Sequence, residues 1–93
     1  MTKTEIITAI DATMAEILAL ASEKGIDTNH PQIEQYKKVA DNLKSVTATI
    51  DDAEFSGSIG NYDNLAKMFV SENGLVRLNY YQTALYNRGY ISK

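Results

Sequence analysis

Residues 33–50 constrain the fold more than any other stretch of this 93-residue chain. Apolar or core-tolerant residues recur there at alternating steps of three and four, at Ile33, Tyr36, Ala40, Leu43, Thr47 and Ile50. That spacing places them along one side of an α-helix. Val39, Val46 and Ala53 widen the apolar side, and mostly charged and amide side chains fill the opposite one. The stretch therefore predicts a helix that packs lengthwise against another apolar surface.

The beginning of the chain supplies such a surface. Thr2 and Glu5 match a capping box, in which a hydroxyl and a carboxylate satisfy free backbone N–H groups at a helix start. Lys24-Gly25-Ile26 predicts the helix end, because glycine adopts a left-handed conformation readily. Between them the three–four spacing recurs at Ile7, Ile10, Met14, Ile17 and Ala21, flanked by Ile6, Leu18 and Leu20. We expect a helix over about residues 3–24.

A short connection then leads to the second helix, over about residues 31–50. Pro31 suits a first helical turn, and we expect its neighbour His30 to serve helix entry rather than act as a base. Two helices of similar length with a short link predict an antiparallel hairpin. The apolar arc of the first helix is wider than one partner helix requires. Either the C-terminal third or a second chain should therefore cover the remainder.

Residues 51–54 are mostly acidic and oppose the dipole of a helix that is ending. The second helix therefore ends near Ile50, or these acids have another use. Residues 55–61 have the composition of a loop. A short third helix is expected next, capped by Asn61 or Asp63 and ended by Asn73-Gly74. Its shared apolar face consists of Leu65, Met68 and Phe69.

The final segment, residues 75–88, allows two interpretations. Leu75, Leu78, Tyr81 or Gln82, and Leu85 follow a helical spacing, and Arg88-Gly89-Tyr90 is typical of a helix end. The tyrosines and β-branched residues of the same region also suit a strand. We expect a helix. The sequence thus predicts a single all-α domain over residues 1–93, a small bundle in which two shorter helices pack on the hairpin.

The residue inventory argues against an enzyme. Cysteine is absent, which excludes disulfides, thiolate metal sites and a thiol nucleophile. No serine lies in a glycine-flanked nucleophile elbow, and His30 is the one histidine. We expect no catalytic residue and no cofactor. Glu5 and Asp11 interrupt any signal-peptide pattern, and no apolar run could span a bilayer, so we expect a cytoplasmic protein without membrane contact.

Charge and aromatic residues are unevenly distributed along the chain. The net charge is −3, with ten acids and five bases in residues 1–60 (−5) and four bases against two acids in residues 61–93 (+2). Both arginines and five of the six tyrosines lie in that last third. The two parts either offset one another within the fold, or the C-terminal third is a contact surface.

The contact-surface interpretation gives the leading functional prediction, a non-enzymatic protein-binding module of the adaptor or small-inhibitor kind. Tyrosine and arginine are enriched where proteins bind one another. The partner would be another protein or a second copy of the chain. The alternative is that about half of the tyrosines belong to the core. The predicted partner-binding residues are Arg77, Asn79, Tyr80, Tyr81, Tyr86, Asn87, Arg88 and Tyr90.

A second hypothesis is nucleic-acid binding. Leu65-Ala66-Lys67, Val70-Ser71, Ala84-Leu85 and Arg88-Gly89-Tyr90-Ile91 faintly resemble the helix-turn-helix half of a winged-helix DNA-binding domain. The resemblance implies that Arg77, Asn79, Tyr80 and Gln82 face the groove. The pieces are irregularly spaced, and two arginines supply little phosphate attraction. The alternative is a core helix with tyrosine hydroxyls at its rim.

A third hypothesis is divalent-cation binding. Residues 52–63 resemble an EF-hand calcium loop, in which oxygen ligands surround the ion and a glycine makes the sharp turn. The resemblance implies that Asp52, Glu54, Ser56 and Asp63 are ligands around Gly57. Position 54 departs from the pattern because a shorter side chain is usual there, and position 63 because a bidentate glutamate is expected. The alternative is a solvated acidic turn before a helix.

Overall fold

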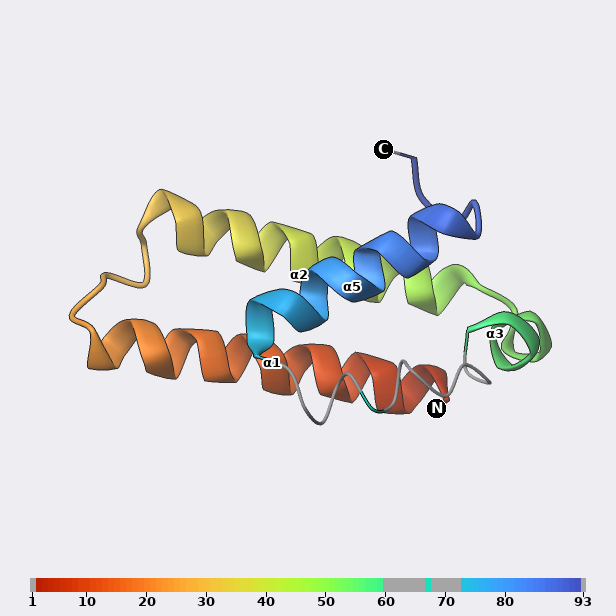
Figure 1. The fold of residues 1–93 in the computed structure, drawn as a ribbon, viewed down its shortest axis with the longest axis horizontal. Helices are drawn as coiled ribbons and strands as arrows, with labels where there is room; N and C mark the ends of the chain where they lie inside the picture. The colour runs from red at the N-terminus through yellow and green to blue at the C-terminus, as the bar shows by residue number, and fades with distance from the viewer. Residues whose placement is uncertain (1, 60–66, 68–72, 93) are drawn as a thin grey trace.

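The computed structural model describes residues 2–59, 67 and 73–92, and these form an all-helical fold (Figure 1). The helices are α1 (Lys3–Glu23), α2 (Pro31–Thr49), α3 (Asp52–Ser58) and α5 (Gly74–Asn87). Helix α1 packs against both α2 and α5. The prediction of an all-α fold is confirmed, and so is the helix, rather than a strand, over residues 75–88. None of the helices described is both long and apolar enough to cross a membrane.

Local signals at both ends of α1 act as predicted. The Thr2 hydroxyl accepts the Glu5 backbone N–H at 3.1 Å, and the Thr2 backbone N–H donates to the Glu5 carboxylate at 3.1 Å. At the other end, Gly25 has a φ of 71°. This left-handed turn lets the Ile26 N–H reach the Ala21 carbonyl at 2.8 Å, which satisfies an otherwise free helix end.

Gly25 and Gly57 make a matched pair for testing this turn. Gly25→Ala is expected to lower the free energy of unfolding by about 1–2 kcal/mol, because a left-handed conformation is costly for an L-residue. Gly57 lies within α3, where an added Cβ would meet no atom within 4 Å. Gly57→Ala should therefore raise the free energy of unfolding by about 0.5 kcal/mol. Urea titration measures both values, and a stabilising Gly25→Ala would contradict the turn.

The apolar stripe of α2 is inside the fold, as predicted. Ile33, Ala40, Leu43, Thr47 and Ile50 are buried, and Tyr36 is half-buried. The helix entry is also as expected, since His30 is the N-cap and its Nδ1 accepts the Gln32 backbone N–H at 3.1 Å.

Polar contacts join the first half of α1 to the last half of α2. The Lys3 ammonium donates to the Ile50 carbonyl at 2.6 Å. The Lys44 ammonium lies 2.8 Å from the Asp11 carboxylate, and this hydrogen bond raises the pKa of Lys44. In Figure 1 the two helices lie side by side along the length of the molecule.

Helix α3 forms where the composition predicted a loop. The Asp51 carboxylate accepts the backbone N–H groups of Ala53 and Glu54 at 3.1 and 3.3 Å, so this acid begins a new helix. Phe55 and Ile59, one turn apart, are then both buried in the core. The loop prediction is therefore wrong for residues 55–58, and residues 60 and 61 fall outside the described part of the chain. Ala53 is exposed on α3 and does not widen the stripe of α2.

Helix α5 begins at the dipeptide that was predicted to end a helix. The Asn73 side-chain oxygen accepts the Val76 backbone N–H at 3.1 Å, which makes Asn73 an N-cap. Gly74 lies close to α1, because a Cβ there would be 3.0 Å from Cγ1 of Ile17 and 3.2 Å from Cγ2 of Thr13. The predicted short helix with Leu65, Met68 and Phe69 falls outside the described residues.

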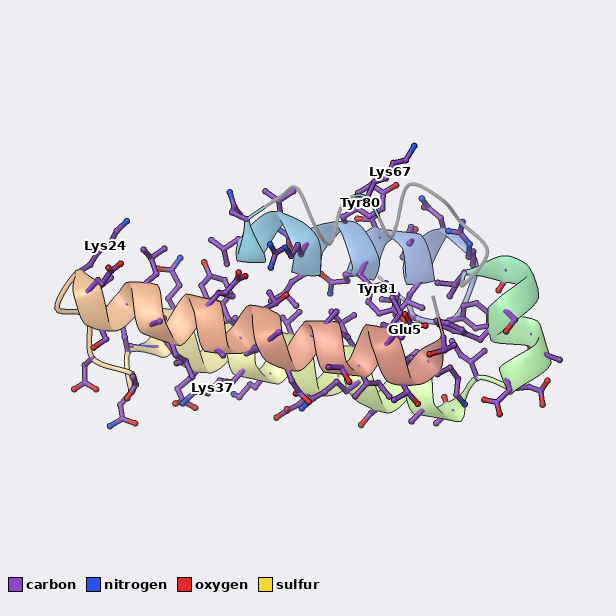
Figure 2. The ribbon with its side chains drawn as sticks, turned by 90° about the horizontal axis from the view of Figure 1, so that it is seen from below. Glu5, Lys24, Lys37, Lys67, Tyr80 and Tyr81 are labelled. Carbon is purple, nitrogen blue, oxygen red and sulfur yellow. The ribbon has the colours of Figure 1, made fainter. Side chains whose placement is uncertain are left out.

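One core joins the four helices of the described residues. Its buried apolar side chains come from α1, α2, α3 with its cap, and α5: Ile6, Ile10, Ala40, Leu43, Ile50, Phe55, Ile59, Leu78, Tyr81 and Leu85. Helix α5 thus covers part of the wide apolar face of α1. This matches the expectation that either the C-terminal third or a second chain covers that face. Figure 2 shows α5 lying as a second layer over α1 and α2.

Candidate protein-binding surfaces

Tyr81, predicted to contact a partner, is a core residue. Its side chain is 0% exposed and points from α5 toward α1 and α2, whereas Tyr80 lies on the other side of α5 (Figure 2). The Tyr81 hydroxyl lies 2.6 Å from the Thr47 hydroxyl. Because Thr47 already donates its single proton to the Leu43 carbonyl at 2.7 Å, Tyr81 is the donor. The prediction of Tyr81 as a contact residue is therefore wrong.

Three other predicted contact residues hold the fold together. Arg77 pairs with Glu16 across the α1–α5 contact, and its side chain is 14% exposed. Arg88 Nε donates to the Ser58 carbonyl at 3.2 Å, which ties the end of α5 to α3. The Tyr90 hydroxyl donates to the Glu54 carboxylate at 2.8 Å. These side chains are committed to contacts within the chain.

The remaining predicted residues lie at the surface of α5. Asn79, Tyr86 and Asn87 are exposed, and Tyr80 is half-buried against the core. Near the end of α5 lies a hollow of 340 Å³, called here the α5 hollow. Its lining is polar and apolar in about equal parts and consists of Gln82, Thr83, Tyr86, Asn87, Ile91 and Ser92. The structure thus brings Tyr86 and Asn87 together and separates them from Arg77.

The EF-hand hypothesis gains no support from helix α3. An EF-hand loop wraps its first ligands around one ion, whereas residues 52–58 are helical and point their side chains in different directions. Asp52 pairs with Lys3 at 3.1 Å, and Glu54 accepts from Tyr90. Asp63 falls outside the described residues. Within the described part of the chain no three acidic or histidine side chains are placed to hold a metal ion.

The nucleic-acid hypothesis gains little from the geometry. Arg77, its main cation, is mostly buried and paired with Glu16, so it is badly placed to reach a phosphate. Asn79 is exposed and Gln82 is half-buried on α5. Two of the pieces that resemble a helix-turn-helix, residues 65–67 and 70–71, lie wholly or mostly outside the described residues.

At the other end of the molecule α1 and α2 extend beyond α5 (Figures 1 and 2). An apolar groove lies there. Three of the large apolar side chains that remain exposed gather there, with Leu20 at 51%, Ile26 at 40% and Leu75 at 39%. We call this the α1–α2 groove. It was not predicted from the sequence, because it depends on where α5 begins along α1.

Two adjoining hollows make up the α1–α2 groove. The first, of 640 Å³, lies between the second half of α1 and the start of α5. The second, of 550 Å³, lies between α1, the connection after it and the start of α2. Ile17, Leu20 and Leu75 line both. The remaining apolar lining of the second hollow comes from Ala21, Ile26 and Ile33.

The charged side chains of the α1–α2 groove are mainly acidic. Its lining contains Glu16, Glu23 and Asp27 against Lys24 and Arg77. Arg77 is already paired with Glu16. Glu23 occupies the last turn of α1, which contains no basic residue, and its carboxylate forms no ion pair with any residue that the structure describes.

Comparison of the chain with protein-family models, with curated proteins and with solved structures finds no match. Function is therefore inferred from the residues and their placement.

Proposed function

We propose that this chain is a non-enzymatic protein-binding module of the adaptor or small-inhibitor kind. In this proposal α1 and α2 form an antiparallel hairpin, the C-terminal helices pack on one part of it, and a partner protein occupies the α1–α2 groove. The observation that carries the proposal is the gathering of Leu20, Ile26 and Leu75 at one exposed site.

These three residues support a binding surface because they lie together. Single exposed apolar side chains are normal, but a contiguous patch with a polar rim marks a binding surface. Leu20 and Leu75 come from different helices and line both hollows of the groove. Burying one leucine side chain stabilises a complex by about 1.5–3 kcal/mol, so two such anchors supply much of the affinity of a moderate complex.

The α5 hollow is the second candidate contact surface of the same module. Tyr86, 40% exposed, and Asn87 supply a large amphipathic side chain and an amide that can hydrogen-bond. Interfaces use this combination at their centre and rim. The α1–α2 groove is favoured over it because it gathers more exposed apolar surface.

The proposal predicts that Leu20→Glu removes partner capture. The immobilised full chain is incubated with extract of its native cells, and the bound proteins are quantified by mass spectrometry. The amount of a genuine partner captured by Leu20→Glu should be at least tenfold lower than the amount captured by the wild type. The reason is that a glutamate carboxylate must lose its water to enter an apolar contact.

Val76→Glu is the matched control. Val76 is 40% exposed, similar to the groove residues, but it lines none of the three hollows. Its variant should retain the partner that Leu20→Glu loses. If every captured protein binds both variants equally, the α1–α2 groove is not the binding surface. Loss with Tyr86→Ala instead would move the site to the α5 hollow.

A further inference from the structure

From the shape and charge of the α1–α2 groove, we infer that its occupant is an amphipathic helix of another protein, with lysine or arginine beside its apolar anchors. This inference rests on the proposed function and specifies the chemistry of the partner. It follows from three observations. The carboxylate of Glu23 pairs with no residue that the structure describes, the groove lining has an excess of acids, and the groove lies beside the first turn of α5.

Glu23 lies where it disfavours the fold of its own chain. The carbonyl end of a helix carries partial negative charge, so an acid in the last turn is repelled and a base would be favoured. The last turn of α1 contains this acid and no base, and the C-cap residue that follows it is Lys24. Its carboxylate lines the first hollow and forms no ion pair with a described residue. A cation on a partner would relieve this repulsion.

The charged residues of the groove lining, Glu23 included, have an excess of negative charge. The carboxylate of Glu16 pairs with Arg77 yet stays 57% exposed, so it can accept a further cation. Asp27 adds a third acid, and Lys24 is the remaining base. This charge disfavours an acidic partner and the surface of an anionic membrane. It also disfavours a second copy of this chain, whose net charge is −3 and whose own groove would bring the same acids into contact.

The packing favours a helix over an extended segment. Helix α5 begins against Thr13 and Ile17 of α1, and the groove continues along α1 from that point. A docked helix would therefore extend the layer that α5 forms over α1 and α2 (Figure 2). From Ile17 to Lys24 the distance along α1 is roughly 10 Å at about 1.5 Å per residue. The groove therefore accommodates about two turns, with anchors spaced at i, i+3 or i+4, and i+7.

A displayed library of helix-forming peptides about 12 residues long tests this inference with the full chain as bait. Peptides are selected on the wild type and counter-selected on Leu20→Glu, and the enriched pool is sequenced. We expect lysine or arginine to be enriched beside apolar residues at helical spacing. Representative peptides should bind Glu23→Lys at least fivefold more weakly, measured by fluorescence anisotropy.

Asp41→Lys is the control, because it makes the same charge change on an exposed carboxylate outside the groove. It should leave peptide affinity within twofold of the wild type. Glu23→Lys should itself raise the melting temperature, since it places a base at the helix end. A melting temperature at or above that of the wild type would show that weaker binding by this variant does not come from unfolding.

The outcomes separate the inference from the proposed function. Peptides that depend on Leu20 but show no basic enrichment, or that bind Glu23→Lys equally well, overturn the inference and leave the groove as a binding surface. A library that yields no peptide dependent on Leu20 overturns both. A wild-type dimer in light scattering that Leu20→Glu converts to a monomer also overturns the inference, because the occupant is then a second copy.

Discussion

Replacing Phe55 with alanine is expected to lower the free energy of unfolding by about 3–5 kcal/mol. Phe55 is 0% exposed and is one of the largest fully buried side chains. It lies on α3, a helix of seven residues that is too short to be stable without packing. Its removal should therefore both leave a cavity and release α3 from the core. A domain of this size has a total stability of about 5–14 kcal/mol, so the loss is a large fraction.

Urea unfolding followed by circular dichroism measures the effect of Phe55→Ala. Ser56→Ala is the matched control, because Ser56 is the next residue of the same helix and is exposed. It should change the free energy of unfolding by less than about 0.5 kcal/mol. A loss below about 1.5 kcal/mol for Phe55→Ala would show that α3 contributes little to the core.

The helices with local signals were predictable from the sequence. In α1 and α2 the apolar period, the caps at Thr2 and His30 and the glycine turn at Gly25 all indicate the same boundaries, and the structure has them within one residue. Each signal acts over one or two turns. A reading of the sequence alone can therefore recover it.

For helix α3 the composition of the sequence and the positions of its residues indicate different structures. Ser, Gly and Ser around residue 57 are typical of a loop. Two other features of the same stretch favour a helix. Asp51 stands where an N-cap belongs, and Phe55 and Ile59 are spaced by four, as buried residues on one helix face are. A short helix with one large buried side chain is decided by tertiary packing more than by propensity.

The candidate site also has features that the sequence predicts and features that it does not. Tyr81 continues the spacing of Leu78 and Leu85, so the helical period already favoured the core over the surface. The partner of Arg77 could not be predicted, because Glu16 lies 61 residues earlier in the chain. The α1–α2 groove could not be predicted either. It arises from the place where α5 begins on α1, which depends on tertiary contacts such as the close approach of Gly74 to Ile17.

Above pH 10, Tyr81 is expected to make the protein progressively less stable. Burial raises the pKa of Tyr81 from 10.0 to about 12, because the phenolate would lose its hydration in the core. Between these values the unfolded chain has released the Tyr81 proton and the folded chain retains it. The unfolded state then binds fewer protons, so stability falls as pH rises, by up to about 1.4 kcal/mol per pH unit.

Tyr81→Phe isolates this effect. Near neutral pH the variant should be less stable by about 0.5–1.5 kcal/mol, because it loses the hydrogen bond to Thr47. Thr47 itself keeps its bond to the Leu43 carbonyl. By pH 11.5 the wild type should have lost about 2 kcal/mol through Tyr81, and the variant lacks that loss. The order of stability should therefore reverse between pH 9 and pH 11.5.

Absorbance at 295 nm follows tyrosine ionisation directly, since the chain contains six tyrosines and no tryptophan. The difference between the folded wild-type and Tyr81→Phe titrations is the titration of Tyr81, and its midpoint should lie near pH 12. The same difference in 8 M urea is the control and should have its midpoint near pH 10. A midpoint below pH 10.5 for the folded protein would mean that water reaches the Tyr81 hydroxyl. The packing among α1, α2 and α5 would then be too loose to bury the Thr47–Tyr81 hydrogen bond.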